Sequence, residues 1–263
     1  MDILLRICCF SLLVMAFSCR QDDGAPVRFF EFDEYSFRRQ SPSCAQDSMR
    51  CIRVAVTLPV LSAEAEAAER INDSLVASVA RGLTVLSDRA VTNREKLSEV
   101  ADSLIVEYRQ FLEEHEAYDI PWEVQTEGEV LFQNGRIVSF EVSNYSYTGG
   151  AHPNTYIRLL SFDTDEGAPL NWGGIIRDST RLLDLAEDFF RRERDIGPEV
   201  DLRSRGFFQD QPFQLPENYA PVERGVYFFY NPYEVAPYAA GPTEFIIPYE
   251  SLRGVLDLSK IRP

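Results

Sequence analysis

The first half of the chain shows two kinds of hydrophobic spacing, and each predicts a different element. Apolar residues alternate with polar ones over residues 51–59, which predicts a strand that ends at Pro59. A less regular alternation over 27–37 predicts an edge strand. Apolar residues then recur at helical spacing within 62–83 and again over 92–116. We therefore expect two strands and two amphipathic helices in this part of the chain.

The middle of the chain contains the clearest hairpin signal. Asn134-Gly135 is a dipeptide that favours tight hairpin turns, and it separates strand-like runs at 127–133 and 136–145. A further strand is predicted over 155–162. The second strand of the hairpin should lead from a buried sheet into the turn at residues 145–152.

The second half predicts a smaller set of elements. Asp178 or Ser179 stands where a helix cap belongs, directly before an amphipathic helical pattern. Strands are predicted at 226–230 and 244–248, and a short helix at 249–254. The proline content of the segment between these two strands argues against a central strand there.

These elements predict the α+β class, with an antiparallel sheet covered by amphipathic helices. We expect two abutting subdomains, over 27–165 and 166–263, that meet near residues 163–172. The chain has 263 residues, of which 45% are hydrophobic, so it can bury a sizeable core.

One segment, residues 143–154, combines aromatic residues, paired glycines, a histidine and a proline in the sequence S-N-Y-S-Y-T-G-G-A-H-P-N. Gly149 and Gly150 permit positive φ, and Pro153 restricts His152 to extended conformations. The segment therefore predicts a rigid turn at the end of a strand. Two interpretations remain open: a structural turn whose tyrosines pack on their neighbours, or a loop that contacts a ligand.

Three stretches carry a resemblance to a known family: residues 53–79, Y-T-G-G-A-H at 147–152 with the turn at 163–170 after it, and 225–252. Together they resemble the paired extracytoplasmic domains of unknown function in the lysozyme-sensing anti-sigma factor RsiV. The first of these domains also precedes the catalytic domain of the peptidoglycan deacetylase PdaC. The resemblance covers roughly residues 50–254 and implies binding of an envelope ligand, either a peptidoglycan-type glycan or a protein such as lysozyme.

Charge narrows the choice of partners. Acidic residues outnumber Lys and Arg by 42 to 26, which gives a formal net charge of −16. Nucleic acid is not expected as a partner, because phosphate contacts require a basic surface. A basic protein partner fits this charge, and so does the simpler interpretation that the excess acid keeps the protein soluble.

The N-terminus predicts export and a lipid anchor. Residues 1–18 contain one arginine ahead of an apolar run that is too short for a comfortable membrane span, as in a secretory signal peptide. Small residues before Cys19 resemble a bacterial lipobox, in which this cysteine becomes lipidated, and residues 19–26 read as a polar tether. We therefore expect the protein in the bacterial cell envelope, anchored to the outer membrane on its periplasmic or surface face.

Cys44 and Cys51 are the cysteines that remain beyond the predicted anchor. An oxidising envelope compartment predicts that they form a disulfide, which we interpret as structural. A metal site is the alternative for this pair, but two further ligands are not nearby in the sequence.

The inventory of catalytic groups is small. The two histidines, His115 and His152, lie in different elements and form none of the short metal-binding motifs. The Asp and two His ligands of a PdaC-type zinc deacetylase are not recognisable, and no cofactor is expected. A cell-wall hydrolase or esterase that uses His152 with a carboxylate remains the alternative from another class. The third hypothesis is a structural lipoprotein that packs on another envelope protein.

The favoured hypothesis is non-catalytic ligand binding through aromatic and polar groups on two loops, at residues 147–154 and 230–238. We predict that the two loops meet in one groove. The candidate ligand-binding residues are Tyr147, Thr148, Gly149, Gly150, His152, Asn154, Tyr230, Tyr233 and Tyr238.

Overall fold

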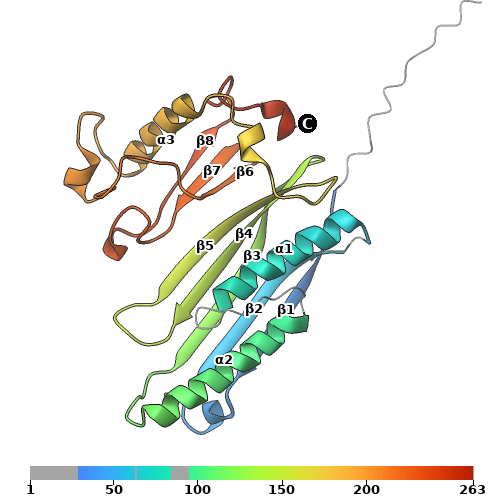
Figure 1. Cartoon of the computed structure of the whole chain (residues 1–263), viewed down its shortest axis with the longest axis vertical. Helices are drawn as coiled ribbons and strands as arrows, with labels where there is room; N and C mark the ends of the chain where they lie inside the picture. Colours follow the sequence, from blue (N-terminus) through green and yellow to red (C-terminus); the bar gives the residue numbers. More distant parts are fainter. Residues whose placement is uncertain (1–28, 63, 84–94, 263) are drawn as a thin grey trace, which may run out of the picture.

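The first structural unit is a long five-stranded sheet, which runs down the middle of the molecule in Figure 1. The structure is a computed structural model and describes residues 29–62, 64–83 and 95–262. The predicted signal peptide, Cys19 and the tether lie outside the described residues, as do the first residues of the second predicted helix. No described helix is both long and apolar enough to cross a membrane.

The strands of this sheet follow one another in space in the order β1-β2-β3-β4-β5. Neighbours are antiparallel except for the parallel pair β2 and β3. Such a pair needs a long crossover connection, and the two helices α1 and α2 provide it. The bounds are β1 Phe32–Gln40, β2 Ile52–Leu61, α1 Glu66–Leu83, α2 Glu95–Glu114, β3 Trp122–Gln133, β4 Ile137–Tyr147 and β5 Asn154–Asp163.

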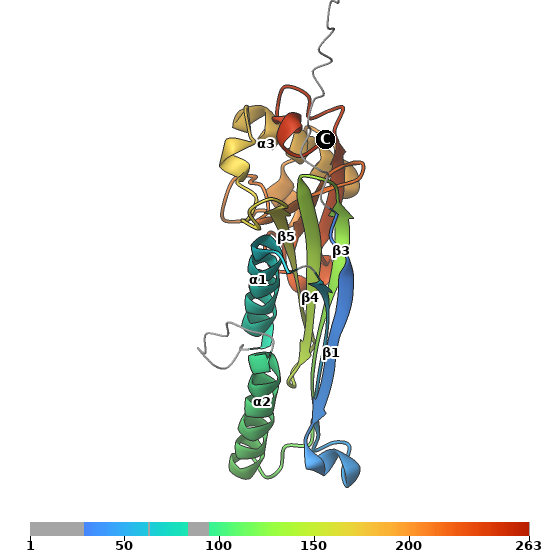
Figure 2. The same cartoon turned by 90° about the vertical axis from the view of Figure 1, so that its right-hand side faces the viewer.

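Helices α1 and α2 lie end to end over one face of the sheet (Figure 2). Alternate residues of β2 point toward them, so Ile52, Val54 and Val56 are almost completely buried. Ile71 and Leu75 of α1 enter the same core, as the helical spacing predicted. The periodicity of the sequence therefore identified both layers of this unit.

The second unit contains a three-stranded antiparallel sheet, β6-β7-β8, and helix α3. Asp178 caps the helix by accepting a hydrogen bond from the Arg181 N–H at 2.9 Å, which confirms the predicted cap. The core between the sheet and the helix is largely aromatic and includes Phe190, Phe228 and Tyr230. The bounds are α3 Ser179–Glu193, β6 Asn218–Val222, β7 Gly225–Tyr230 and β8 Thr243–Pro248. Short 3-10 helices occur at Pro42–Ala45, Trp172–Gly174, Leu202–Arg205, Tyr238–Ala240 and Leu258–Lys260.

Two local predictions were wrong. Pro59 does not end its strand, because β2 continues to Leu61. A proline is tolerated there because β2 pairs with β3 only as far as Thr57. The segment 249–254 forms successive turns and not a helix.

The two units meet where β6 approaches the outer edge of β5. The side-chain amides of Asn218 and Asn231 bind the backbone of β5: their oxygens accept hydrogen bonds from the N–H groups of Leu159 and Ile157, at 3.1 and 2.7 Å. Both amide nitrogens donate to the Ile157 carbonyl. Two asparagines thus occupy the hydrogen-bonding positions of a missing sixth strand. The α+β class is confirmed, with mostly antiparallel sheets.

Candidate functional site

A β-hairpin places the first candidate loop. Strands β3 and β4 pair antiparallel around Asn134-Gly135, so β4 carries the chain from the buried sheet into the turn at 148–153. Gly149 and Gly150 have φ of 93° and 112°, which confirms the expected positive values. The Tyr118 hydroxyl donates to the Thr148 carbonyl at 2.7 Å and fixes the start of the turn.

The second candidate loop follows β7 and is held from both ends. At its start the Glu234 carboxylate accepts hydrogen bonds from the N–H groups of Asn231 and Glu217, at 2.8 and 3.3 Å. Burial raises the pKa of this carboxyl, and the two backbone hydrogen bonds oppose that shift. At the far end the Arg194 guanidinium donates to the carbonyls of Ala240, Gly241 and Pro242.

Tyr233 lies near the start of this loop in a strained backbone conformation. Its φ is +70°, although a tyrosine has none of the freedom of glycine in that region. Its side chain is 60% exposed, one of the most exposed large apolar side chains in the described part of the chain. Strained residues of this kind often occur at binding sites, where the surrounding structure holds them in place.

The two loops meet at His152, as predicted. Its ring stacks on the ring of Tyr238, with 3.6 Å between the centroids and 9° between the planes. The Nδ1 atom lies 2.9 Å from the Pro153 carbonyl, which can only accept a hydrogen bond, so this nitrogen carries a proton. The Nε2 atom lies 3.0 Å from the Tyr233 hydroxyl. Three rings from segments about 80 residues apart therefore form one surface cluster, which we call the aromatic cluster (His152, Tyr233 and Tyr238).

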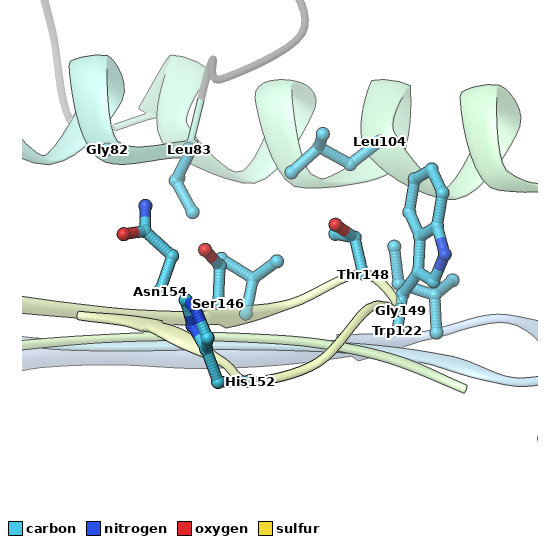
Figure 3. Close-up of a pocket in the computed structure, with 11 residues that line it drawn as sticks. Gly82, Leu83, Leu104, Trp122, Ser146, Thr148, Gly149, His152 and Asn154 are labelled. Atoms are coloured by element: carbon cyan, nitrogen blue, oxygen red, sulfur yellow. The ribbon is translucent and has the colours of Figure 1, made fainter. Parts of the chain in front are cut away.

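A cavity of about 260 Å³ lies beside the aromatic cluster, between the helices and the sheet. Figure 3 shows Leu83 and Leu104 reaching from the helices toward Ser146 and Asn154 on the strands, with Trp122 at one end. Thr148, Gly149 and His152 complete the wall on the side of the turn. We call this the helix–sheet cavity. The helices contribute apolar side chains to its wall, and the strands and the turn contribute a few hydroxyl and amide groups. This is the usual composition of a small-molecule site.

Tyr233 belongs to a different hollow of about 280 Å³, lined also by Phe208 and Val235. The loops are thus in contact, but the described residues do not combine them into a single groove. Tyr147 is half-buried, and its hydroxyl donates to the Gly150 carbonyl at 3.3 Å. Its neighbours Ser146 and Thr148 line the helix–sheet cavity, so Tyr147 itself points to the other side of the sheet.

The prediction of Tyr230 as a binding residue was wrong. Its side chain is completely buried in the aromatic core, and its hydroxyl donates to the Gln214 carbonyl at 2.6 Å. Burial raises the pKa of this phenol, so it stays protonated at all ordinary pH values. Tyr230 therefore belongs to the core that lies under the loop after β7, and its side chain is not accessible to a ligand.

The structure confirms the disulfide between Cys44 and Cys51, with Cα atoms 4.6 Å apart. It joins the 3-10 helix at Pro42–Ala45 to the residue before β2 and so closes the connection between β1 and β2, which is consistent with a structural role. The described residues contain no group of three or more His, Cys, Asp or Glu side chains arranged to hold a metal ion.

Family comparisons match two separate parts of the chain. Residues 46–155 match the family described as Deacetylase PdaC, and residues 177–250 match a protein family of unknown function, DUF3298. Over these two ranges the chain is similar to a PdaC-type domain followed by a DUF3298-type domain. The resemblance to this domain pair, inferred from the sequence, is confirmed.

Curated relatives cover part of the chain. Immunogenic protein MPT64 of Mycobacterium tuberculosis and immunogenic protein MPB64 of Mycobacterium bovis are each 27% identical to it over 114 residues. That alignment covers 43% of this chain, and the chain spans about half the length of these relatives, 49%.

Solved structures show the same fold over most of the chain. A DUF3298 family member from Bacteroides fragilis is similar with a TM-score of 0.71 and 22% identity, covering 86% of this chain and 93% of that one. A DUF3298 family protein from Pseudomonas aeruginosa has a TM-score of 0.63 and 18% identity, covering 88% and 96%. At these identities the likeness establishes the fold alone.

The matched ranges also show that the aromatic cluster draws its residues from both family matches. His152 belongs to the PdaC-type domain, whereas Tyr233 and Tyr238 belong to the DUF3298-type domain. The cluster is therefore a junction to which both domains contribute. Sequence reasoning missed the cavity walls Leu83, Leu104 and Trp122, because apolar residues at core spacing give no separate signal when they line a cavity.

Proposed function

We propose that this protein is a non-catalytic binding protein of the bacterial cell envelope, and that it binds a peptidoglycan-type glycan at the junction of its two domains. The observation that carries the proposal is the aromatic cluster beside the helix–sheet cavity. A sugar has apolar C–H faces that pack on aromatic rings, and hydroxyl groups at its rim that need hydrogen-bonding partners. The exposed ring of Tyr233 supplies the first requirement, and Ser146, Thr148 and Asn154 supply the second. These groups line two different hollows, so a bound sugar would extend across His152, which lines the helix–sheet cavity and contacts Tyr233.

The geometry at His152 supports binding over hydrolysis. A catalytic histidine acts as a base when one nitrogen is turned toward the substrate and a carboxylate or backbone carbonyl orients the other. Here Nδ1 faces the Pro153 carbonyl and Nε2 faces the Tyr233 hydroxyl. The Nε2 atom, which a base would turn toward its substrate, is thus engaged in the contact between the two loops, whereas Nδ1 is bonded within its own loop.

The envelope location rests on the N-terminal sequence and on the domain pair. We propose that Cys19 carries a lipid that anchors the protein to the outer membrane. The test is detergent phase partitioning of the full-length protein after expression in a Gram-negative host. The wild type should enter the detergent phase and Cys19→Ala the aqueous phase, and equal partitioning would contradict the anchor.

A second candidate ligand is a basic protein such as lysozyme, and the net charge of −16 favours it. Association steered by this charge would weaken steeply as salt is raised, whereas stacking of a sugar on aromatic rings would change little. Salt dependence therefore distinguishes the two ligands in one titration series.

The deciding experiment is calorimetric titration of the full-length protein with chitotriose and with lysozyme, at low and raised salt. Tyr238→Ala should weaken glycan binding roughly three- to tenfold, because it removes the ring that stacks on His152. Tyr233→Phe keeps the ring but loses the hydroxyl near Nε2, so it should weaken binding less. Met49→Ala, at an exposed site near the disulfide in the sequence, is the control and should bind as the wild type does.

The outcomes separate the alternatives. Glycan binding that Tyr238→Ala leaves unchanged would overturn the proposed site. Glycan turnover that disappears in His152→Ala would establish the hydrolase instead. Salt-sensitive binding of lysozyme without glycan binding would select the protein ligand.

A further inference from the structure

A second cavity, of about 230 Å³, lies between the last turns of α1 and the side of β4 and β5 that faces the helices. Paired residues of β4 and β5 form the sheet side of this cavity: Asn144 lies opposite Tyr156, and Val142 lies opposite Arg158. We call it the arginine cavity, and the polar residues that line it include Ser78, Arg81, Asn144, Asn154, Tyr156 and Arg158.

The charge of this cavity is opposite to that of the protein. Two arginines and no acidic residue are among the described residues that line it, although the whole chain carries a net charge of −16. The Arg158 guanidinium lies 5.5 Å from the centre of the Tyr156 ring, a cation–π distance that holds the charge beside an aromatic face. The Tyr156 side chain is 36% exposed, so part of its surface remains accessible to a ligand.

One buried polar group in the wall has no hydrogen-bond partner among the described residues. The Ser78 side chain is only 3% exposed, and its hydroxyl makes no hydrogen bond within this part of the chain. Leaving such a group without a partner destabilises the folded state, and native proteins rarely do so without a reason. A ligand in the cavity would supply the missing partner.

The arginine cavity adjoins the helix–sheet cavity, because Gly82 and Asn154 line both. Each cavity alone is smaller than the ~300–1,000 Å³ typical of ligand pockets, whereas the two together fall within that range. A single ligand could therefore extend from the apolar walls beside Trp122 to the guanidinium of Arg158.

We propose that the arginine cavity binds the carboxylate of an acidic sugar. In this arrangement Arg158 and Arg81 pair with the carboxylate, Ser78 and Asn144 bind its oxygens or neighbouring hydroxyls, and the sugar ring packs on Tyr156. Arginine suits this role because its planar group matches the two oxygens of a carboxylate. The inference deepens the proposed glycan binding and rests on it.

The two arginines should not contribute equally. Arg81 lies in the last turn of α1, where the negative end of the helix dipole already interacts favourably with its charge. Arg158 lies on a strand, which has little net dipole. A bound carboxylate should therefore depend more on Arg158 than on Arg81.

N-acetylmuramic acid and N-acetylglucosamine form a matched pair of probes, because they share the ring and the acetamido group and differ by one lactyl carboxylate. The full-length protein should bind the acid roughly tenfold or more tightly in calorimetric titration. Arg158→Gln should abolish that preference and leave the affinity for N-acetylglucosamine unchanged, with Arg158→Lys restoring part of it. Arg109→Gln, which removes one exposed charge from α2, should keep the full preference.

A Ser78→Ala variant separates a binding role from a structural one. Because the hydroxyl makes no hydrogen bond to the described residues, its removal should leave the melting temperature unchanged or raise it, while binding of N-acetylmuramic acid weakens. A fall in melting temperature without a change in affinity would contradict the assigned role.

Glucuronic acid, titrated against glucose, shows whether the site accepts a carboxylate attached directly to the ring or requires one carried by a lactyl ether. Equal binding of N-acetylmuramic acid and N-acetylglucosamine would overturn the carboxylate site and leave the proposed glycan binding intact. No binding of either sugar, or of longer chitooligosaccharides, would overturn both.

Discussion

Replacing Gly149 with alanine tests how the turn that carries His152 is held. Its φ of 93° is unfavourable for any residue with a Cβ, which costs about 1–3 kcal/mol. A Cβ at this position would also lie 2.2 Å from the Tyr118 hydroxyl, too close for the two to coexist. The hydroxyl would have to move and would lose its hydrogen bond to the Thr148 carbonyl, worth about 0.5–1.5 kcal/mol.

The neighbouring glycine supplies a matched control. Gly150 has a φ of 112°, but a Cβ there would meet no atom within 4 Å. Gly150→Ala should therefore lower the free energy of unfolding only by the cost of a positive φ. Gly149→Ala should lower it by about 2–4 kcal/mol, because the hydrogen bond of Tyr118 is lost as well. For a chain of this size each kcal/mol lowers the melting temperature by about 2–4 °C. Gly149→Ala should accordingly melt about 1–6 °C below Gly150→Ala in thermal unfolding followed by circular dichroism.

A double-mutant cycle tests the stated cause. Tyr118→Phe removes the hydroxyl, and the next ring atom would lie 3.3 Å from the new Cβ, a distance that small shifts can relieve. The cost of Gly149→Ala should therefore be smaller by about 1 kcal/mol when it is measured in the Tyr118→Phe variant. Equal melting of the two alanine variants, or a cost of Gly149→Ala that Tyr118→Phe leaves unchanged, would refute the reasoning.

Two further predictions concern stability. Burial, together with the charges of Glu129 and Glu244, raises the pKa of Glu141. Its carboxyl therefore ionises less readily in the folded than in the unfolded protein, and the free energy of unfolding falls as pH rises through the raised pKa. Glu141→Gln should raise the melting temperature at neutral pH and flatten its decline with pH, and the exposed Glu123→Gln should do neither. Replacing both Cys44 and Cys51 with serine opens an eight-residue loop and should cost roughly 2.5 kcal/mol, which chemical denaturation with and without reductant would measure.

Hydrophobic spacing was sufficient for most of the fold, because burial on one face imposes a period on the sequence. It predicted β2, both helices of the first unit and the hairpin around Asn134-Gly135. It missed β6, whose Pro221 and short length give no strand signal, and it could not give the parallel pairing of β2 with β3. Pairing depends on contacts between distant segments, which a local pattern does not contain.

The candidate site was predictable only where its chemistry is local. The glycines and proline around His152 identified a rigid turn, and its contact with the loop of Tyr233 and Tyr238 followed as a hypothesis. Tyr230 was misassigned because a buried tyrosine and an exposed one look alike in the sequence. The arginine cavity gave no signal, since Arg81 and Arg158 come together only through the packing of α1 on β5.

The asparagines at the outer edge of β5 have a consequence for how the two domains can separate. If the domains parted, the N–H groups of Ile157 and Leu159 and the Ile157 carbonyl would lose Asn218 and Asn231 as partners. A strand edge with free backbone groups pairs readily with a strand of another molecule. The two side chains that join the domains therefore also cover the backbone groups at the edge of β5, and this should disfavour association with other copies of the protein.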